Sequence, residues 1–258
     1  MTLFLAVVSA KGGVGKTTTT INLAHALAEF GRTVIAVDTD ITAPNLSIHL
    51  GITKYPKTLH HVLHGEASIH DIIYKHQSGI QVIPGSVAYD HVTTAPINQM
   101  RNVIPNLKGK SEIVILDSAP GLGEEAQTTI ALCDYAIVVV TPDLAAVSDA
   151  RKTVKLIKQL NRKILGVVLN RAHAGDELSK TEVETFLEIP VLGTIPDDFH
   201  IRSAYKIKCP VVFAHPDAPS TVQYKKLAAK IIGEKYENIV PSKKQASMME
   251  YIKQGLLG

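Results

Sequence analysis

Short apolar runs alternate with segments of helical spacing along most of the chain. Several of these runs are rich in β-branched residues and apolar on both faces, which is typical of central parallel strands. The predicted strands span residues 3–9, 33–38, 80–85, 112–117, 135–141, 164–170 and 191–196. The clearest helices are predicted over about 17–30, 144–160 and 220–232, bounded by Gly31, Asp143 and Gly233. This alternation predicts a doubly wound α/β fold, with a mostly parallel sheet of about seven or eight strands flanked by helices.

The alternation stops near residue 235, so we expect one domain over residues 1–235 and a C-terminal tail over 236–258. Two lysines, Lys243 and Lys244, open the apolar part of the tail. Four apolar side chains then fall within an arc of about 100° on a helix: Met248, Met249, Ile252 and Leu256. This pattern is that of a short amphipathic helix at a membrane surface. The alternative is a helix end packed on the domain, or a tail without fixed structure.

The composition favours a globular cytoplasmic protein. The 258 residues are 45% hydrophobic, enough for a core, and the net charge of +3 is too mild to predict nucleic acid as the main partner. Cys133 and Cys209 lie far apart and form no CxxC pair, which fits a reducing compartment. The apolar N-terminus lacks the basic leader of an export signal and is interpreted as a buried strand. No apolar run approaches the roughly 20 residues of a membrane span.

The segment SAKGGVGKTT, residues 9–18, follows the first predicted strand and opens the first predicted helix. The usual phosphate-binding loop is Gly, four residues of any kind, then Gly-Lys-Ser/Thr, but here Ala10 replaces the first glycine and Lys11 follows it. Backbone N–H groups of residues 12–17 can still surround phosphates at the helix N-terminus. Lys16 would neutralise the β- and γ-phosphates, and the Thr17 hydroxyl would hold Mg²⁺.

The predicted nucleotide-binding residues of this loop are Gly12, Gly13, Val14, Gly15, Lys16, Thr17 and Thr18. Gly12 and Gly13 supply the backbone freedom that Ala10 lacks. A glycine-rich turn without a ligand is the alternative, and the preceding strand, the following helix and the Lys-Thr pair all argue against it.

Three aspartates follow predicted strands of the same sheet. Asp38 and Asp40 end the second strand, and Asp117 ends the strand over 112–117, where a carboxylate can hold Mg²⁺ directly or through water. The alternative for the first pair is an acidic loop that caps a helix near Pro44. Asn170 ends another strand, at the edge where open α/β sheets bind ligands, and its amide can pair with an adenine edge by donor and acceptor together.

The motif KGGVGKTT resembles the deviant Walker A motif, KGGxGK[ST], of the MinD/ParA family of P-loop ATPases. The resemblance extends to about residue 235 and includes the segments DTDITAPNLSIHLG, TLHHVLHGEASIHD and VLNR. These middle segments are most similar to archaeal-type MinD proteins. The resemblance implies the P-loop NTPase fold, with ATP and Mg²⁺ as ligands.

The resemblance also implies an ATP-dependent homodimer in which two ATP molecules lie between the subunits. Lys11 would then reach the phosphates of the partner's nucleotide, much as an arginine finger supplied in trans does. A cation there is physically reasonable, because two polyphosphates repel each other unless positive charge lies between them. With Lys16 and Asp40, Lys11 makes up the expected catalytic set.

Further site residues follow from the family pattern. Asp40 would position the attacking water, and Asp38 would support the metal region beside Thr17 and Asp117. Asn170, with residues 196–198, would line the base pocket, so Pro196 and Asp197 are predicted cofactor-binding residues.

One loop departs from the family pattern. After Asp117, the family usually has Ser/Thr/Cys-Pro-Ala-Gly, whereas this chain has Ser118, Ala119, Pro120 and Gly121. The spacing of Gly121 is kept, so we expect its N–H to contact the γ-phosphate.

The resulting functional hypothesis is a MinD-like ATPase, which dimerises when it binds Mg-ATP and hydrolyses ATP slowly. Such a switch docks on the cytoplasmic face of the membrane through its tail and positions a protein partner, for cell division or for a surface structure. The alternative is a ParA-like partition ATPase that binds DNA non-specifically. For that function we would expect a stronger basic patch and no amphipathic tail. Iron–sulfur carriers on this fold need paired cysteines, and an inactive scaffold would not need the lysines and aspartates of the site.

Two other patterns are interpreted as surface features. The helix over 144–160 has a basic side that we expect to be a solvated face, with DNA or an acidic partner as the alternative. Its residues are Arg151, Lys152, Lys155, Lys158 and Arg162. His60 and His64 have the i, i+4 spacing of two metal ligands, but no third ligand suggests itself, and a partly exposed helix face is expected.

Overall fold

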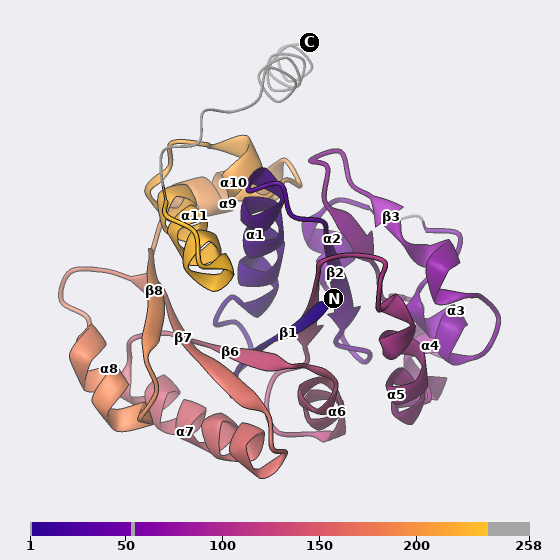
Figure 1. Cartoon of the computed structure of the whole chain (residues 1–258), viewed down its shortest axis with the longest axis horizontal. Coiled ribbons are helices and arrows are strands. Elements are labelled where there is room, and N and C mark those ends of the chain that lie inside the picture. Colours follow the sequence, from indigo (N-terminus) through magenta and orange to yellow (C-terminus); the bar gives the residue numbers. More distant parts are fainter. Residues whose placement is uncertain (1, 53–54, 237–258) are drawn as a thin grey trace.

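The computed structural model describes residues 2–52 and 55–236. All helices and strands of this part lie between Leu3 and Ile232 (Figure 1). The predicted amphipathic helix of the tail lies outside the described residues.

One eight-stranded sheet forms the centre of the described structure, in the order β3-β4-β2-β5-β1-β6-β7-β8. The strands are β1 Leu3–Val8, β2 Val34–Thr39, β3 Tyr74–Lys75, β4 Gln81–Ile83, β5 Ile113–Ser118, β6 Tyr135–Val140, β7 Lys163–Ala172 and β8 Val191–Pro196. All neighbouring pairs are parallel except β3 with β4. The seven predicted strands are confirmed, and β3, a two-residue antiparallel edge strand, was not predicted.

The three predicted helices are confirmed within one or two residues of their expected ends as α1 Lys16–Glu29, α7 Leu144–Gln159 and α11 Pro219–Ile232. The Asp143 carboxylate accepts the Ala146 N–H at 2.8 Å and so caps α7, and Gly233 ends α11 in the left-handed conformation. The other α-helices are α2 Leu46–His49, α3 Leu59–Leu63, α4 Tyr89–Thr94, α5 Met100–Val103, α6 Glu124–Leu132, α8 Lys180–Leu187, α9 Phe199–Lys206 and α10 Val211–Ala214. Single 3₁₀ turns lie at Ile69–Ile72, Ile97–Gln99 and Ile104–Leu107.

Helices cover both faces of the sheet (Figure 1). Along β1, Leu5 and Val7 pack into one hydrophobic cluster with residues of α1 and α11, whereas Phe4, Ala6 and Val8 pack into the other with residues of α6, α7 and α8. This two-residue alternation, with both faces buried, explains why the strand reads as one continuous apolar run. The fold is therefore doubly wound, as predicted.

The strand order also determines where a ligand can bind. β1 lies between β5 and β6, so the chain winds in opposite directions on its two sides. The crevice at the carboxyl ends of the strands, at such a switch point, is where open α/β sheets bind ligands. The loop after β1 is the segment SAKGGVG. Asp38 and Asp117 lie near the carboxyl ends of β2 and β5, and Asp40 lies in the loop after β2.

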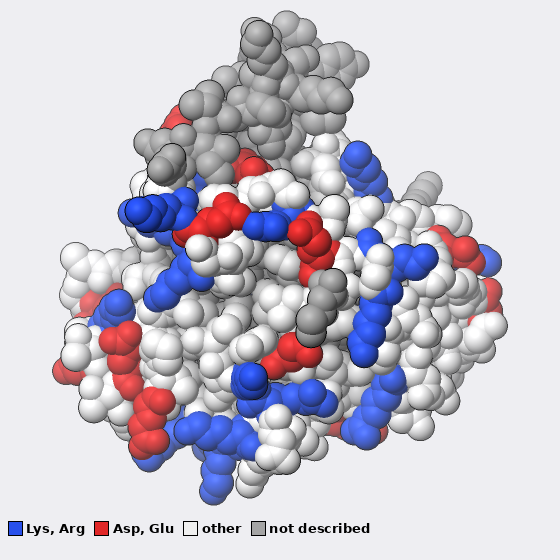
Figure 2. Space-filling model, in the orientation of Figure 1, with Lys and Arg blue, Asp and Glu red and all other residues white. Residues whose placement is uncertain are grey.

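The basic residues of α7 form a solvated face (Figure 2). The side chains of this set are all exposed: Arg151, Lys152, Lys155, Lys158 and Arg162. Lys152 pairs with Asp149 at 2.9 Å, and Arg151 lies over the ring of Phe186. Within residues 2–52 and 55–236, no helix is long and apolar enough to cross a bilayer.

The expectation for His60 was wrong. Its ring is fully buried: Nε2 lies 3.0 Å from the Ile41 carbonyl oxygen, and Nδ1 accepts the Ser86 N–H at 2.9 Å. His60 is therefore a structural residue that joins α3 to two loops, whereas His64 is exposed. Among the described residues, no group of three or more His, Cys, Asp and Glu side chains is arranged to hold a metal.

Burial lowers the pKa of His60 to about 4, against about 6.5 in an unfolded chain. Between these values the unfolded chain binds the proton and the folded protein does not, so stability falls as the pH falls from 6.5 to 4. At pH 5 this histidine should lower the free energy of unfolding by about 2 kcal/mol relative to pH 7. Urea unfolding of wild type, His60→Gln and the exposed control His64→Gln at both pH values measures this. An unchanged pH dependence in His60→Gln would contradict it.

Candidate nucleotide site

The loop between β1 and α1 presents backbone donors to the crevice. Gly13 and Gly15 have φ of 76° and 98°, the left-handed region in which glycine is unstrained. The N–H groups of Gly12, Gly13 and Gly15 donate to no protein acceptor in the part of the chain that the structure describes. They lie beside the N-terminus of α1, where the helix dipole favours an anion. Lys16 begins the helix, and Thr17 and Thr18 follow on its first turn.

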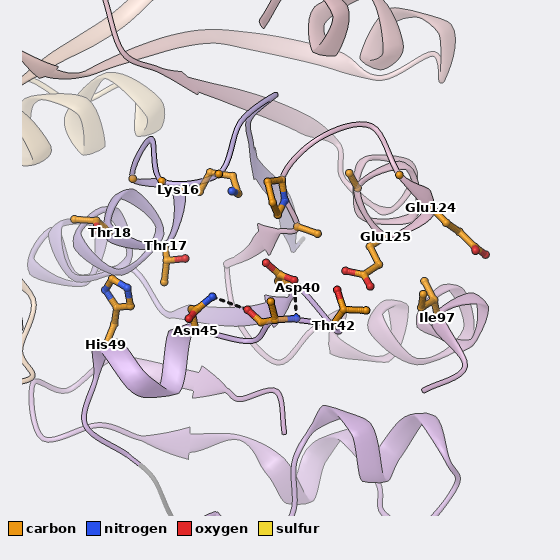
Figure 3. A pocket seen from close by; sticks show the side chains of 18 of the residues that line it. Lys16, Thr17, Thr18, Asp40, Thr42, Asn45, His49, Ile97, Glu124 and Glu125 are labelled. Atoms are coloured by element: carbon orange, nitrogen blue, oxygen red, sulfur yellow. Dashed lines mark hydrogen bonds between the residues drawn. The ribbon is translucent and has the colours of Figure 1, made fainter. Parts of the chain in front are cut away.

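A cleft of about 690 Å³ opens beside this loop (Figure 3). It is lined by Gly12, Gly13, Gly15, Lys16, Thr17 and Thr18 of the loop and α1. Asp40 and Thr42 after β2, and Ala119, Pro120 and Glu125 after β5, complete its far side. The structure thus brings the predicted phosphate-binding residues and Asp40 to one cavity, except Val14, whose side chain is buried in the core outside the lining.

Lys16 lines the cleft, and Asp117 is buried outside the lining but near enough for its charge to act on Lys16. Lys16 is only 8% exposed, and burial lowers its pKa while Asp117 and Asp40 raise it. Burial raises the pKa of Asp117 to about 6, while hydrogen bonding from Thr17, the charge of Lys16 and the Thr20 hydroxyl at 3.1 Å act in the opposite direction. A buried carboxylate beside a threonine at the first turn of α1 is the donor set expected for Mg²⁺.

Asp38 lies deeper than expected. It pairs with Asp117 in the β2–β5 register, is fully buried, and has a pKa raised well above its usual value by burial and by the charge of Asp117. Its carboxylate accepts the Leu46 N–H at 3.0 Å and the Asp40 N–H at 3.4 Å. Asp38 therefore holds the loop between β2 and α2. Because Leu46 is the first residue of α2, this bond is partly the helix cap that the alternative interpretation expected.

Asp40 lies at the wall of the cleft, 9% exposed. Its Oδ1 accepts the Ala43 N–H at 3.1 Å, which fixes the loop after β2 (Figure 3). Burial raises its pKa, and hydrogen bonding from Ala43 and the charge of Lys16 lower it.

Lys11 does not line the cleft of its own chain. Its Nζ lies 3.3 Å from the Asp149 carboxylate on α7, and its side chain is 44% exposed. The two lysines of the motif thus differ: Lys16 lines the cavity, whereas Lys11 is exposed outside its lining.

The predicted base-binding residues lie in a second cavity of about 290 Å³ beside Gly15 and Thr18. Asn170 and Asp197 line it, and Pro196, the last residue of β8, lies next to Asp197 but is not part of the lining. One N–H of the Asn170 amide donates to the Val14 carbonyl at 2.7 Å. The amide carries a second N–H, so the predicted pairing by donor and acceptor together stays a prediction. Its Oδ1 is buried without a hydrogen-bond partner among the described residues.

The expectation for Gly121 was also wrong. Its N–H donates to the Ser9 carbonyl oxygen at 3.0 Å, and its φ is 84°. This bond ties the loop after β5 to the loop after β1, so the N–H is not free to contact a phosphate.

Arg171 and Glu125 line these cavities, and sequence reasoning assigned no role to either of them. Arg171 follows Asn170 at an irregularity of the β7–β8 pairing, has a φ of 57°, and lines both the cleft and the base cavity. Left-handed backbone at a non-glycine residue is strained and is common at ligand sites. Glu125 is a buried carboxyl on α6 that no motif marks.

The two cysteines are both buried and free. Burial raises the pKa of the Cys133 thiol to about 12, and Gln77 donates to the Cys209 sulfur at 3.3 Å. They belong to different elements and flank no common cavity among those described here.

Comparison with known proteins gives the family. A family model described as ParA: NUBPL iron-transfer P-loop NTPase matches residues 1–232. An uncharacterized ATP-binding protein of Methanocaldococcus jannaschii is 39% identical over 259 residues, covering 100% of this chain and 98% of that protein. Among solved structures, the cell division ATPase MinD of Pyrococcus furiosus has a TM-score of 0.87 and 36% identity, covering 90% of this chain and 99% of that one.

The septum site-determining protein MinD of Pyrococcus horikoshii, solved in complex with Mg-ADP, has a TM-score of 0.86 and 36% identity. The alignment covers 90% of this chain and 96% of that one. The free N–H groups of the loop, the buried Lys16 and Asp117 and the unpartnered Asn170 Oδ1 fit such a nucleotide and its magnesium ion. With its fold, its KGGVGKTT loop and these relatives, the chain belongs to the ParA family of P-loop NTPases.

Proposed function

We propose that this protein is an ATPase of the MinD type. It dimerises when Mg-ATP is bound, hydrolyses ATP slowly, and in the ATP state associates with the cytoplasmic face of a membrane and positions a partner protein. The relatives named above support this assignment, because two of the solved structures are cell division proteins of this type.

The observation that carries the proposal is the placement of Lys11. A lysine that is part of the nucleotide motif, yet exposed and outside the lining of its own cleft, has no role in a monomeric site. In a dimer that faces two clefts toward each other, an exposed lysine at the crevice can reach the nucleotide of the partner. Its ion pair with the partly exposed Asp149 is weak enough to be exchanged for a triphosphate.

The remaining residues have distinct roles in this proposal. Lys16 and the loop N–H groups bind the β- and γ-phosphates, and Thr17 with Asp117 would hold the magnesium ion. The ion supplies charge neutralisation at the β- and γ-phosphates when it is bound. Asp38 fixes the loop that carries Asp40.

Asp40 orients the attacking water, so Asp40→Ala should bind Mg-ATP but not hydrolyse it, and the ATP-bound dimer should accumulate. Size-exclusion chromatography with saturating Mg-ATP or Mg-ADP measures the dimer, and Asp217→Ala, at an exposed aspartate outside both cavities, is the control that should still turn over. An Asp40→Ala protein that stays monomeric at saturating ATP would contradict both the role of Asp40 and the nucleotide-dependent dimer.

Arg171 should contact the nucleotide at the cost of backbone strain. Arg171→Gly should lower ATP affinity about tenfold or more by removing a charged donor. It should also raise the free energy of unfolding by up to about 1 kcal/mol, because glycine relieves the left-handed backbone.

A matched control exists at Glu188, which has the same φ of 57° at the end of α8, outside both cavities. Glu188→Gly should gain similar stability and leave ATP affinity unchanged. Calorimetric titration with ATP and thermal unfolding of the apo proteins measure both effects. Equal ATP affinity in Arg171→Gly and wild type would contradict the contact.

A ParA-type protein that binds DNA non-specifically is the second candidate, favoured by the exposed basic face of α7. Replacement of Lys155 and Lys158 by glutamate should abolish DNA retardation if this alternative is correct. If the MinD-type function is correct, the wild-type protein should retard DNA weakly or not at all at physiological salt.

A further inference from the structure

Glu125 is a buried carboxyl in the cleft, beyond the residues that the motif marks. It is the second residue of α6, is 8% exposed, and lines the cavity opposite the loop after β2. Figure 3 shows its carboxyl turned toward Asp40 and Thr42, whereas the neighbouring Glu124 points away from them. Adjacent strands of the sheet, β2 and β5, bring the two loops together, with Thr39 paired to Ser118 in register.

The carboxyls of Asp40 and Glu125 are similarly arranged. Asp40 uses Oδ1 to accept the Ala43 N–H, and no protein donor contacts its Oδ2 among the described residues. Glu125 interacts with Thr42 of the same loop, and its Oε2 is buried without a hydrogen-bond partner in this part of the chain. Each carboxyl therefore holds the loop and leaves an oxygen without a protein partner.

A buried acceptor without a donor costs about 1–3 kcal/mol, so a donor is expected at Oε2. Burial and the charge of Asp40 both raise the pKa of Glu125. A second negative charge beside Asp40 is therefore unfavourable, and we expect the nucleotide site to use it. Thr42 and Ile41 donate to this carboxyl, but no hydrogen bond reaches Oε2 from the residues that the structure describes. A water molecule in the cleft is the donor of suitable size.

We propose that Glu125 is a second water-positioning carboxyl for ATP hydrolysis, whose Oε2 accepts a hydrogen bond from the water that Asp40 orients. This inference rests on the proposed function. The water oxygen forms a bond to the γ-phosphorus, the bond from that phosphorus to the β,γ-bridging oxygen breaks, and ADP leaves with the electron pair. One water proton stays on the phosphate product and the other is released to solvent, so Glu125 is unchanged.

Glu125→Gln separates this role from a purely structural one. Glutamine keeps the length of the side chain and one acceptor oxygen for Thr42, but places an NH₂ group where the carboxylate has its second acceptor. Glu124→Gln removes a charge from the same turn of α6 and serves as the matched control. Glu125→Ala removes both the acceptor and the contact with Thr42.

The measurements are single-turnover ATP hydrolysis, ATP affinity and thermal unfolding of the apo protein. In Glu125→Gln, hydrolysis should fall about 10- to 100-fold. ATP affinity should stay within about threefold, and the apo protein should be at least as stable as wild type, because an unpaired buried charge is removed. Combined with Asp40→Asn, it should lower hydrolysis no further than Asp40→Asn alone, since both residues hold one water.

Wild-type hydrolysis retained in Glu125→Gln would overturn this inference and leave the proposed function intact. So would a loss in Glu125→Gln that Glu124→Gln shares, or one that follows weaker ATP binding or a less stable apo protein. A wild-type protein that binds ATP without hydrolysing it would overturn the proposed ATPase activity and this inference together.

Discussion

Lys11→Ala is expected to lower ATP hydrolysis by about 10²-fold or more while ATP binding stays largely intact. Binding should survive because Lys16, the free N–H groups of the loop and the Asp117 region all belong to the same chain. Hydrolysis should fall because two nucleotides facing each other lose the cation between them, so the ATP-bound dimer is destabilised as well.

Steady-state hydrolysis and calorimetric ATP binding, measured on the same preparation, separate these effects. Lys152→Ala is a suitable control, since it removes the other lysine paired with Asp149 but lies outside the motif. A Lys11→Ala protein with normal hydrolysis, or one that fails to bind ATP, would contradict the proposed role.

Anionic liposomes are expected to pellet the protein with Mg-ATP, much less with Mg-ADP, and not after deletion of residues 243–258. These residues lie outside the described structure, so this expectation rests on their sequence. Each lysine near an anionic surface adds only about 1 kcal/mol, so a single tail should bind poorly. A dimer presents two tails, and the second binds at high effective concentration, which makes membrane affinity report the bound nucleotide.

A point variant tests the apolar arc without shortening the chain. Ile252→Asp lies within the arc and should abolish pelleting, whereas Lys253→Gln lies outside it and should reduce pelleting only slightly. The truncated chain should still bind ATP and dimerise, because every described site residue lies before residue 236. Equal pelleting in both nucleotides, or of the truncated chain, would remove the membrane switch and favour the DNA-binding alternative.

Much of the fold could be predicted because its strands are buried on both faces. Runs such as residues 113–116 are apolar throughout, and the loops between strands and helices carry capping residues such as Asp143. β3 could not be predicted, because a two-residue strand has no periodicity and exists only through its pairing with β4. The spacing of His60 and His64 is the same on a buried and on an exposed helix face, so burial of His60 followed from packing alone.

The site could be predicted where chemistry is local and not where it depends on tertiary contacts. The glycine, lysine and threonine of the P-loop are consecutive, and the structure places them on one cleft. One N–H of Asn170 donates to Val14, 156 residues earlier, and the Gly121 N–H donates to Ser9, and neither bond can be inferred from a motif. Glu125 lies on the helix after β5 and packs against the loop after β2, so its burial cannot be predicted from the sequence around it.

Mixing Lys11→Ala with Asp40→Ala subunits tests the central claim, that each nucleotide site is completed by the partner subunit. In a mixed dimer, the Lys11→Ala subunit keeps Asp40 and receives Lys11 from its partner, so one of the two sites is complete. With mixed dimers demonstrated by two affinity tags, hydrolysis should rise at least about tenfold above either variant alone. As a control, the Asp40→Ala subunit is replaced by one that carries both Asp40→Ala and Lys11→Ala. This mixture should show no rise in hydrolysis, because neither subunit supplies Lys11. Mixed dimers that show no restored hydrolysis would contradict the claim.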